Sequence, residues 1–157
     1  MDEVEVYVLC RAREKGAAVA FLDKFLPRRH SSADEFLFPE LSDSMQEVYR
    51  SPEEVMERLE LESNQSYALY WDSDEAGARR QAMLFFTSDG EMIAGLVVPA
   101  IAASKALVEL AEVVGGQFGF LTTENPPPET STQFIDLCRA STLTALVDGR
   151  VREGSAL

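Results

Sequence analysis

The most regular hydrophobic pattern in the chain covers residues 67–99 and predicts one strand followed by a β-hairpin. Two apolar runs flank the pair Asp89-Gly90. Such a pair is typical of a two-residue type I′ turn, because glycine adopts a positive φ without steric cost. This turn places Ser88 opposite Glu91, and that pairing sets the register of the whole hairpin.

In this register both faces of the hairpin are apolar. One face carries Leu84, Phe86, Ile93 and Val97, and the other carries Met83, Phe85, Met92, Leu96 and Val98. A strand with one solvated face would alternate with polar residues, so we expect the hairpin in the middle of a sheet with both faces covered. Helices are expected to cover one face. The other face could be covered by further helices, a second copy of the chain or a ligand.

The rest of the chain predicts strands and helices in an order typical of an α+β protein. Ser51, Pro52 and Glu54 are a typical helix start, with a capping serine, a proline at the first helical position and a glutamate at the third. Helices are expected at residues 17–26, 51–61, 102–114 and 131–140, and strands or extended segments at 3–12, 34–41, 67–71, 118–123 and 142–147. We predict a single domain, residues 1–157, with a mostly antiparallel twisted sheet of about five to six strands and helices packed mainly on one face. A polar tail is expected from about residue 148.

Negative charge is concentrated in one part of the chain. The formal net charge is −13 at pH 7, and residues 31–75 hold two Lys or Arg against thirteen Asp or Glu. This excess disfavours nucleic acid as a partner, because phosphates require a basic surface. An acidic surface attracts a basic protein instead. The competing interpretation is that these carboxylates only keep the protein in solution.

The candidate partner-binding residues come from this acidic part of the chain. The outer face of the helix expected at residues 51–61 is acidic. Trp71 stands at the end of a strand beside three further acidic residues and could supply the apolar centre of a contact surface. The full candidate set is Asp43, Glu47, Glu53, Glu57, Glu60, Trp71, Asp72, Asp74 and Glu75.

No motif in the sequence indicates catalysis, a metal site or a cofactor. His30 is the only histidine, so a His-His metal pair is excluded and any histidine-based catalysis would rest on this residue. The acidic run that begins at Asp72 lacks the spacing of a calcium-binding EF-hand loop. We therefore predict a protein that is not an enzyme and that holds neither a metal nor a cofactor.

The two cysteines and the apolar runs indicate a cytoplasmic protein. Cys10 and Cys138 lie in separate apolar segments and are predicted to be buried, reduced thiols, although a disulfide between them is left open. The acidic N-terminus differs from a signal peptide. The longest apolar run, near residues 93–103, is too short to span a bilayer, so no membrane partner is expected.

Three segments together resemble small bacterial immunity-type proteins of polymorphic toxin systems. They are the acidic-ended strand at 67–72, the apolar hairpin at 83–98 and the run Gly-Phe-Leu-Thr-Thr-Glu-Asn-Pro-Pro-Pro-Glu at 119–129. The resemblance implies a non-enzymatic protein that sequesters a cognate toxin. It supplies no functional residues.

Two classes of function follow from these observations. The leading hypothesis is an acidic binding protein that sequesters a basic partner protein or toxin. The alternative is a small-molecule-binding or enzymatic domain with a pocket on the second apolar face of the hairpin, and with Tyr67, Trp71 or His30 at its mouth. A third hypothesis is a homodimer formed through the second apolar face of the hairpin.

Overall fold

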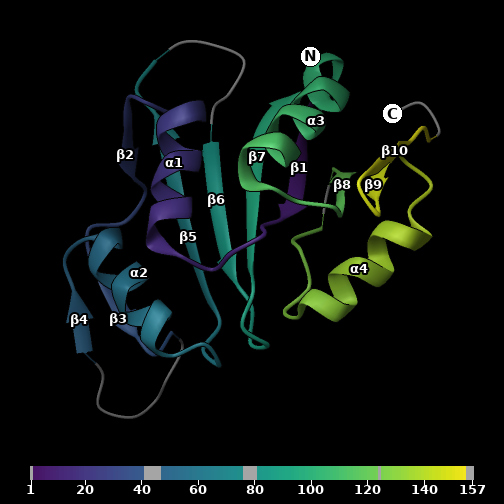
Figure 1. Cartoon of the computed structure of the whole chain (residues 1–157). Coiled ribbons are helices and arrows are strands. Elements are labelled where there is room, and N and C mark those ends of the chain that lie inside the picture. Colours follow the sequence, from purple (N-terminus) through teal and green to yellow (C-terminus); the bar gives the residue numbers. More distant parts are fainter. Residues whose placement is uncertain (1, 41–46, 76–80, 124, 155–157) are drawn as a thin grey trace.

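The computed structural model describes residues 2–40, 47–75, 81–123 and 125–154 and has an α+β fold (Figure 1). The main sheet contains β1 (Glu3–Leu9), β2 (Arg29–Ser31), β5 (Tyr67–Ser73), β6 (Gln81–Phe86), β7 (Met92–Pro99), β8 (Gly119–Thr122), β9 (Ala145–Val147) and β10 (Arg150–Arg152). Their order is β10-β9-β8-β1-β7-β6-β5-β2, and all pairs are antiparallel. A separate two-stranded sheet pairs β3 (Phe36–Phe38) with β4 (Glu47–Tyr49).

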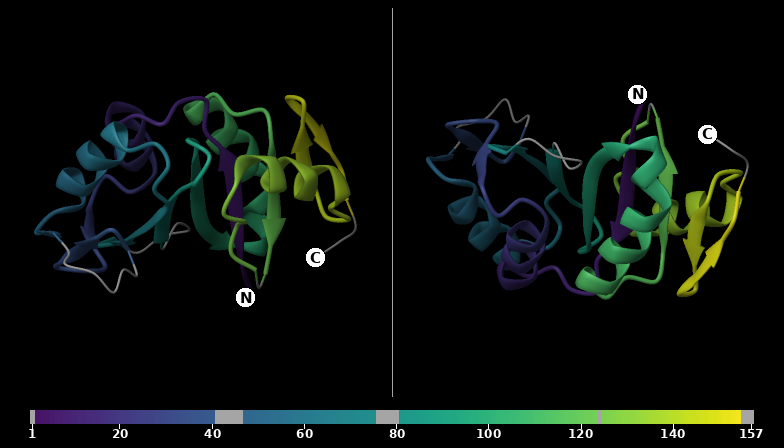
Figure 2. Two further views of the ribbon diagram at one scale, coloured as in Figure 1. Left: turned by 90° about the horizontal axis from the view of Figure 1, so that it is seen from below. Right: turned by 90° about the horizontal axis from the view of Figure 1, so that it is seen from above.

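Four helices complete the described part of the chain. They are α1 (Lys15–Phe25), α2 (Pro52–Leu61), α3 (Ala103–Val114), which follows the 3₁₀ turn η1 (Ala100–Ala102), and α4 (Ser131–Ala140). The predicted start of α2 is confirmed, since the Ser51 side chain accepts a hydrogen bond from the Glu54 N–H at 3.3 Å. Figure 2 shows α1 and α2 at one end of the molecule and α4 at the other.

Two details of the predicted fold are corrected. The main sheet has eight strands in the described residues, because the three-residue strands β2, β9 and β10 join it. Arg150–Arg152 lies where a polar tail was expected and forms β10. The helices also occupy both faces, since α1, α2 and α3 contribute to one apolar core and α4 contributes to the other.

The hairpin lies inside the sheet as predicted, but its register differs by one residue. Phe86 pairs with Met92, and a three-residue loop, residues 88–90, replaces the expected two-residue turn. The Thr87 hydroxyl accepts the Glu91 N–H at 2.8 Å, and the Thr87 N–H donates to the Glu91 carbonyl at 2.9 Å. In this loop only Gly90 has a positive φ, +92°. A type I′ turn needs positive φ at two successive residues.

A one-residue change of register moves every side chain of one strand to the other face. Leu84 and Phe86 therefore share a face with Met92, Leu96 and Val98, whereas Met83 and Phe85 share the opposite face with Ile93 and Val97. Two successive positive φ angles do occur elsewhere, at Asp148 and Gly149 (51° and 78°), where they join β9 to β10.

The sheet separates two apolar cores. One face of β1, β6 and β7 packs against the apolar stripes of α1, α2 and α3. The other core contains Tyr7, Met83, Ile93 and Phe120, and α4 covers it with Phe134. Because α4 packs mainly against β8 and β9, none of the four described helices covers the outer half of this second face, over β5 and β6.

A row of residues across the second face is built around the ring of Tyr7. Opposite residues on neighbouring strands run from Tyr70 through Met83, Gly95 and Tyr7 to Phe120. The Tyr7 ring lies across β7, and a Cβ at Gly95 would stand 2.6 Å from it. The Tyr7 hydroxyl reaches the Met83 sulfur at 3.8 Å. Glycine at 95 is therefore required for this packing.

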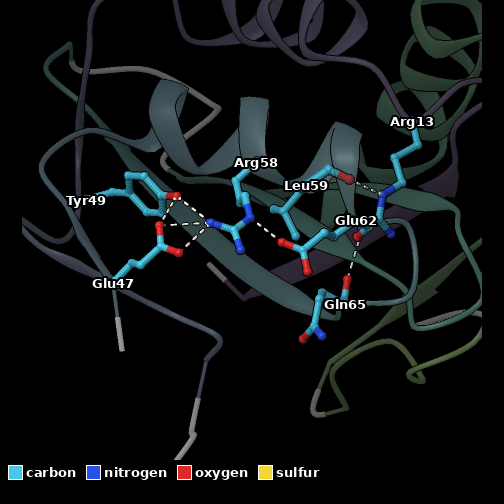
Figure 3. A network of polar contacts seen from close by, with 7 residues as sticks. All are labelled: Arg13, Glu47, Tyr49, Arg58, Leu59, Glu62 and Gln65. Carbon is cyan, nitrogen blue, oxygen red and sulfur yellow. Dashed lines mark hydrogen bonds and ion pairs between the residues drawn. The ribbon is translucent and has the colours of Figure 1, made fainter. Parts of the chain in front are cut away.

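Arg13 joins three parts of the fold through main-chain carbonyls. All five N–H groups of a guanidinium can donate, and here each has an acceptor at 2.7–3.3 Å. The acceptors are the carbonyls of Leu59, Glu62 and Gln65 at the end of α2, and of Thr87 and Glu91 beside the hairpin loop. Figure 3 shows the α2 side of this contact.

Replacing Gly95 by alanine is expected to destabilise the protein. The new methyl group would collide with the buried Tyr7 ring, and overpacking of this kind lowers the free energy of unfolding by about 2 kcal/mol. Urea denaturation measures the change. Gly16→Ala is the matched control, because a Cβ at this helical position meets nothing within 4 Å. Equal stability of the Gly95→Ala variant and the wild type would contradict the packing described.

Replacing Arg13 by alanine is expected to lower the free energy of unfolding by about 3 kcal/mol, because five carbonyls lose a charged donor. Arg13→Lys should recover only part of the loss, since an ammonium has three donors. Arg11→Ala, at an exposed position two residues earlier, is the control and should stay within about 0.5 kcal/mol of wild type. Equal effects at both positions would refute the assigned role of Arg13.

Candidate functional site

The predicted acidic residues lie in two groups at the same end of the molecule. Asp43 falls outside the described residues. Glu47, Glu53, Glu57 and Glu60 belong to β4 and α2, whereas Asp72, Asp74 and Glu75 lie at or just after the end of β5, beside β2. In Figure 1 the first group lies at the lower left and the second at the upper left, so the length of β5 separates them.

Several carboxylates of the α2 group contact cations of the same chain. The Lys15 ammonium lies 2.6 Å from a Glu57 oxygen, and the Lys15 main-chain N–H donates to Glu60 at 2.6 Å. Arg58 lies 2.8 Å from both oxygens of Glu47 and also contacts Glu62 (Figure 3). Hydrogen bonds from Arg58 hold the pKa of Glu47 below its usual value.

The second group surrounds the single histidine. His30 Nδ1 lies 2.5 Å from an Asp74 oxygen, and Nε2 lies 3.8 Å from Asp72. The Ser32 hydroxyl donates to Asp72 at 2.8 Å. Among the described residues no hydrogen bond joins Ser32 to His30, and both side chains approach the Asp72 carboxylate instead. We interpret the cluster as a set of polar contacts on the surface.

Trp71 does not belong to a contact surface in this structure. Its side chain is 2 % exposed and packs in the core beneath α1, α2 and α3. A buried indole cannot form the apolar centre of an exposed surface. The suggestion that Trp71 could do so is therefore corrected.

The uncovered half of the second sheet face contains an open groove in two parts. The larger part, about 350 Å³, lies between β5 and residues 32–40. The smaller part, about 150 Å³, extends over the end of β6 to Pro127 and Pro128. Glu40, Tyr67 and Ala68 line both parts, so these three residues mark the middle of the groove.

Local chain geometry explains why the groove is open. β2 pairs with only the last three residues of β5, and the final contact is the Ser32 N–H donating to the Tyr70 carbonyl at 2.9 Å. The chain then turns away and returns near Tyr67, whose hydroxyl donates to the Leu37 carbonyl at 2.7 Å. Between these two contacts the edge of β5 borders the groove.

Glu40 is the acidic residue at the centre of the groove. Burial raises the pKa of its carboxyl group, and a hydrogen bond from the Ala68 main chain acts in the opposite direction. Its charge acts on both tyrosines of the groove. Burial is the main cause that raises the pKa of Tyr67 to about 12, and Glu40 adds to the rise at Tyr67 and at Tyr70.

The groove differs from the pocket considered in the sequence analysis. Tyr67 lines it as expected, but Trp71 and His30 line neither part. Of the predicted second face of the hairpin, Phe85 lines the smaller part, whereas Met83 and Leu96 line neither part and are 2 % and 0 % exposed. Glu40 was not a candidate, because its position depends on where β2 ends and no local pattern in the sequence indicates that.

The two cysteines are free and buried, as predicted. Cys10 lies in the core under α1, α2 and α3, whereas Cys138 lies in the core under α4. The sheet therefore separates them and excludes a disulfide within this fold. Burial raises the pKa of each thiol to about 12.

The described residues contain neither a metal-binding cluster nor a membrane-spanning helix. No group of three or more His, Cys, Asp or Glu side chains has the arrangement needed to hold a metal ion. None of the described helices combines the length and the apolar character needed to cross a bilayer.

Comparisons with known proteins returned no matching family model, curated protein or solved structure.

We expect both thiols to be unreactive in the folded protein. At about pH 8, a thiol with a pKa near 12 is ionised only about once in 10⁴, and the thiolate is the reactive form. An aromatic disulfide reagent should therefore label neither cysteine until denaturant is added, and then label two per chain. Labelling of the folded protein should become faster as the pH rises. Rapid labelling at neutral pH would contradict the described burial.

Proposed function

We propose that this chain is a non-enzymatic binding protein that docks a basic protein on the acidic end formed by β3, β4, α2 and β5. The sequestration of a cognate toxin, which the resemblance to immunity-type proteins implies, is the form of this function that we favour. The supporting observation is spatial. In the sequence, residues 31–75 hold thirteen acidic and two basic residues, and the described parts of this segment lie at one end of the molecule, away from α4 (Figure 1).

The ion pairs within this end are compatible with the proposal. An approaching protein experiences the summed charge of a surface, and the field extends about 8–10 Å at physiological salt. Lys15 and Arg28 each neutralise one partner, Glu57 and Glu75. These cations and the two basic residues of the segment are too few to balance its carboxylates. The remaining negative potential would guide a basic partner and raise the association rate.

The test begins with affinity capture using the full chain, followed by measurement of the association rate. We expect a partner with net positive charge and a rate that falls by about tenfold or more between about 0.05 and 0.5 M salt. Reversing three charges at the acidic end, with Glu53→Lys, Glu57→Lys and Asp74→Lys, should lower the rate at low salt by a similar factor. The dissociation rate should change less, because steering acts before contact.

The control reverses three acidic residues elsewhere on the surface. Glu112→Lys, Asp136→Lys and Glu153→Lys change the net charge by the same amount, and each position is exposed. This variant should keep most of the wild-type rate. The proposal fails if both triple variants associate equally fast, or if the rate is insensitive to salt.

A further inference from the structure

The charge of Glu40 is not balanced within the part of the protein that the structure describes. Two glutamates line the larger part of the groove. Glu35 is paired with Arg50, at 2.7 Å. Glu40 has the Ala68 main chain as its hydrogen-bond partner, and no described Lys, Arg or His forms an ion pair with it. The Glu40 side chain is exposed at the groove, and an exposed carboxylate still attracts an opposite charge, so a ligand that places a cation against it would be favoured.

The lining around Glu40 is suited to apolar side chains. Leu37 and Tyr70 both line the larger part of the groove, and they are 47 % and 39 % exposed. They give the wall beside Glu40 an apolar surface that the apolar side chains of a ligand could contact. Tyr70 also makes an edge-to-face contact with Phe85, at 5.8 Å between ring centres, which holds its ring against the sheet.

The edge of β5 gives the groove its direction. Hydrogen-bonding groups alternate between the two sides of an antiparallel strand. Because the Tyr70 carbonyl accepts from β2, the main-chain groups of Ala68 point to the same side, where β2 is no longer present. The Ala68 main chain donates to Glu40 on this side, so the Glu40 carboxylate stands beside the edge of β5. An extended chain lying along this edge would fill the space between β5 and residues 32–40.

We infer that the groove binds an extended segment of the basic partner, with one Lys or Arg side chain on Glu40 and neighbouring apolar side chains against Leu37 and Tyr70. The inference rests on the proposed function, because the basic partner supplies the cation. A small amine would satisfy Glu40 alone. An extended segment also uses the edge of β5 and the apolar wall, as in known cases of strand addition to a sheet edge.

The first experiment uses a defined peptide in place of the partner. The probe is acetylated and amidated Val-Thr-Lys-Thr-Val, in which both valines share a face with the lysine when the chain is extended. Amide chemical shifts of the labelled full chain report where it binds, and a titration gives the affinity. We expect the amide chemical shifts of residues 32–40 and 67–70 to change when the peptide is added. Binding should be about tenfold weaker when methionine replaces the lysine of the peptide.

Two glutamine variants test the role of Glu40. Glu40→Gln keeps an oxygen for the Ala68 N–H but removes the charge, so the preference for lysine over methionine should fall to less than about twofold. Glu35→Gln is the matched control, because Glu35 lines the same groove with its charge already paired to Arg50. This variant should keep the preference. Retention of the preference in Glu40→Gln, its absence in the wild type, or shifts confined to another surface would overturn the inference.

The outcome is distinguishable from a failure of the proposed function. The triple reversal at the acidic end leaves Glu40 in place and should preserve lysine-dependent binding of the short peptide. If the partner associates in a salt-dependent way while Glu40→Gln changes nothing, the groove assignment fails and the acidic docking surface stands. If the triple reversal leaves partner association unchanged, the docking proposal fails whatever the peptide does.

Discussion

The five hydrogen bonds of the Arg13 guanidinium constrain the rest of the structure. The guanidinium holds the carbonyls of Thr87 and Glu91 together and at the same time reaches the end of α2. The same hairpin loop reaches the opposite face, because the Asp89 carboxylate accepts hydrogen bonds from the Ser131 N–H and hydroxyl at the start of α4. Partial burial opposes ionisation of Asp89, but these bonds lower its pKa to about 2. One loop thus connects the helices of both faces.

The features of the fold that depend on local pattern were predictable, and those that depend on distant residues were not. The apolar hairpin and the cap of α2 follow from neighbouring residues. The register of the hairpin does not, because the Thr87 hydroxyl and Arg13 favour a three-residue loop over the turn that Asp89-Gly90 alone would adopt. The placement of α4 on the second face depends in the same way on a long-range contact, the hydrogen bonds between Asp89 and Ser131.

The candidate site shows the same division. Counting charges along the chain identified the acidic segment, and the fold places its described part at one end of the molecule. Which carboxylates are paired could not be foreseen, since Lys15 and His30 reach Glu57 and Asp74 from distant parts of the chain. The burial of Trp71 depends on which face of β5 the helices cover. Glu40 became a candidate only when the path of residues 32–40 was known.

The groove along β5 exists because β2 is short, so a change in the length of β2 could create or remove it. Three residues of β2 cover one end of β5, and the rest of that edge borders the groove. Insertions after Ser31 that let the strand continue would pair the remaining edge and remove the groove without touching either apolar core. Divergent descendants of this fold could therefore gain or lose a ligand by changes in the length of a peripheral segment, at little risk to folding.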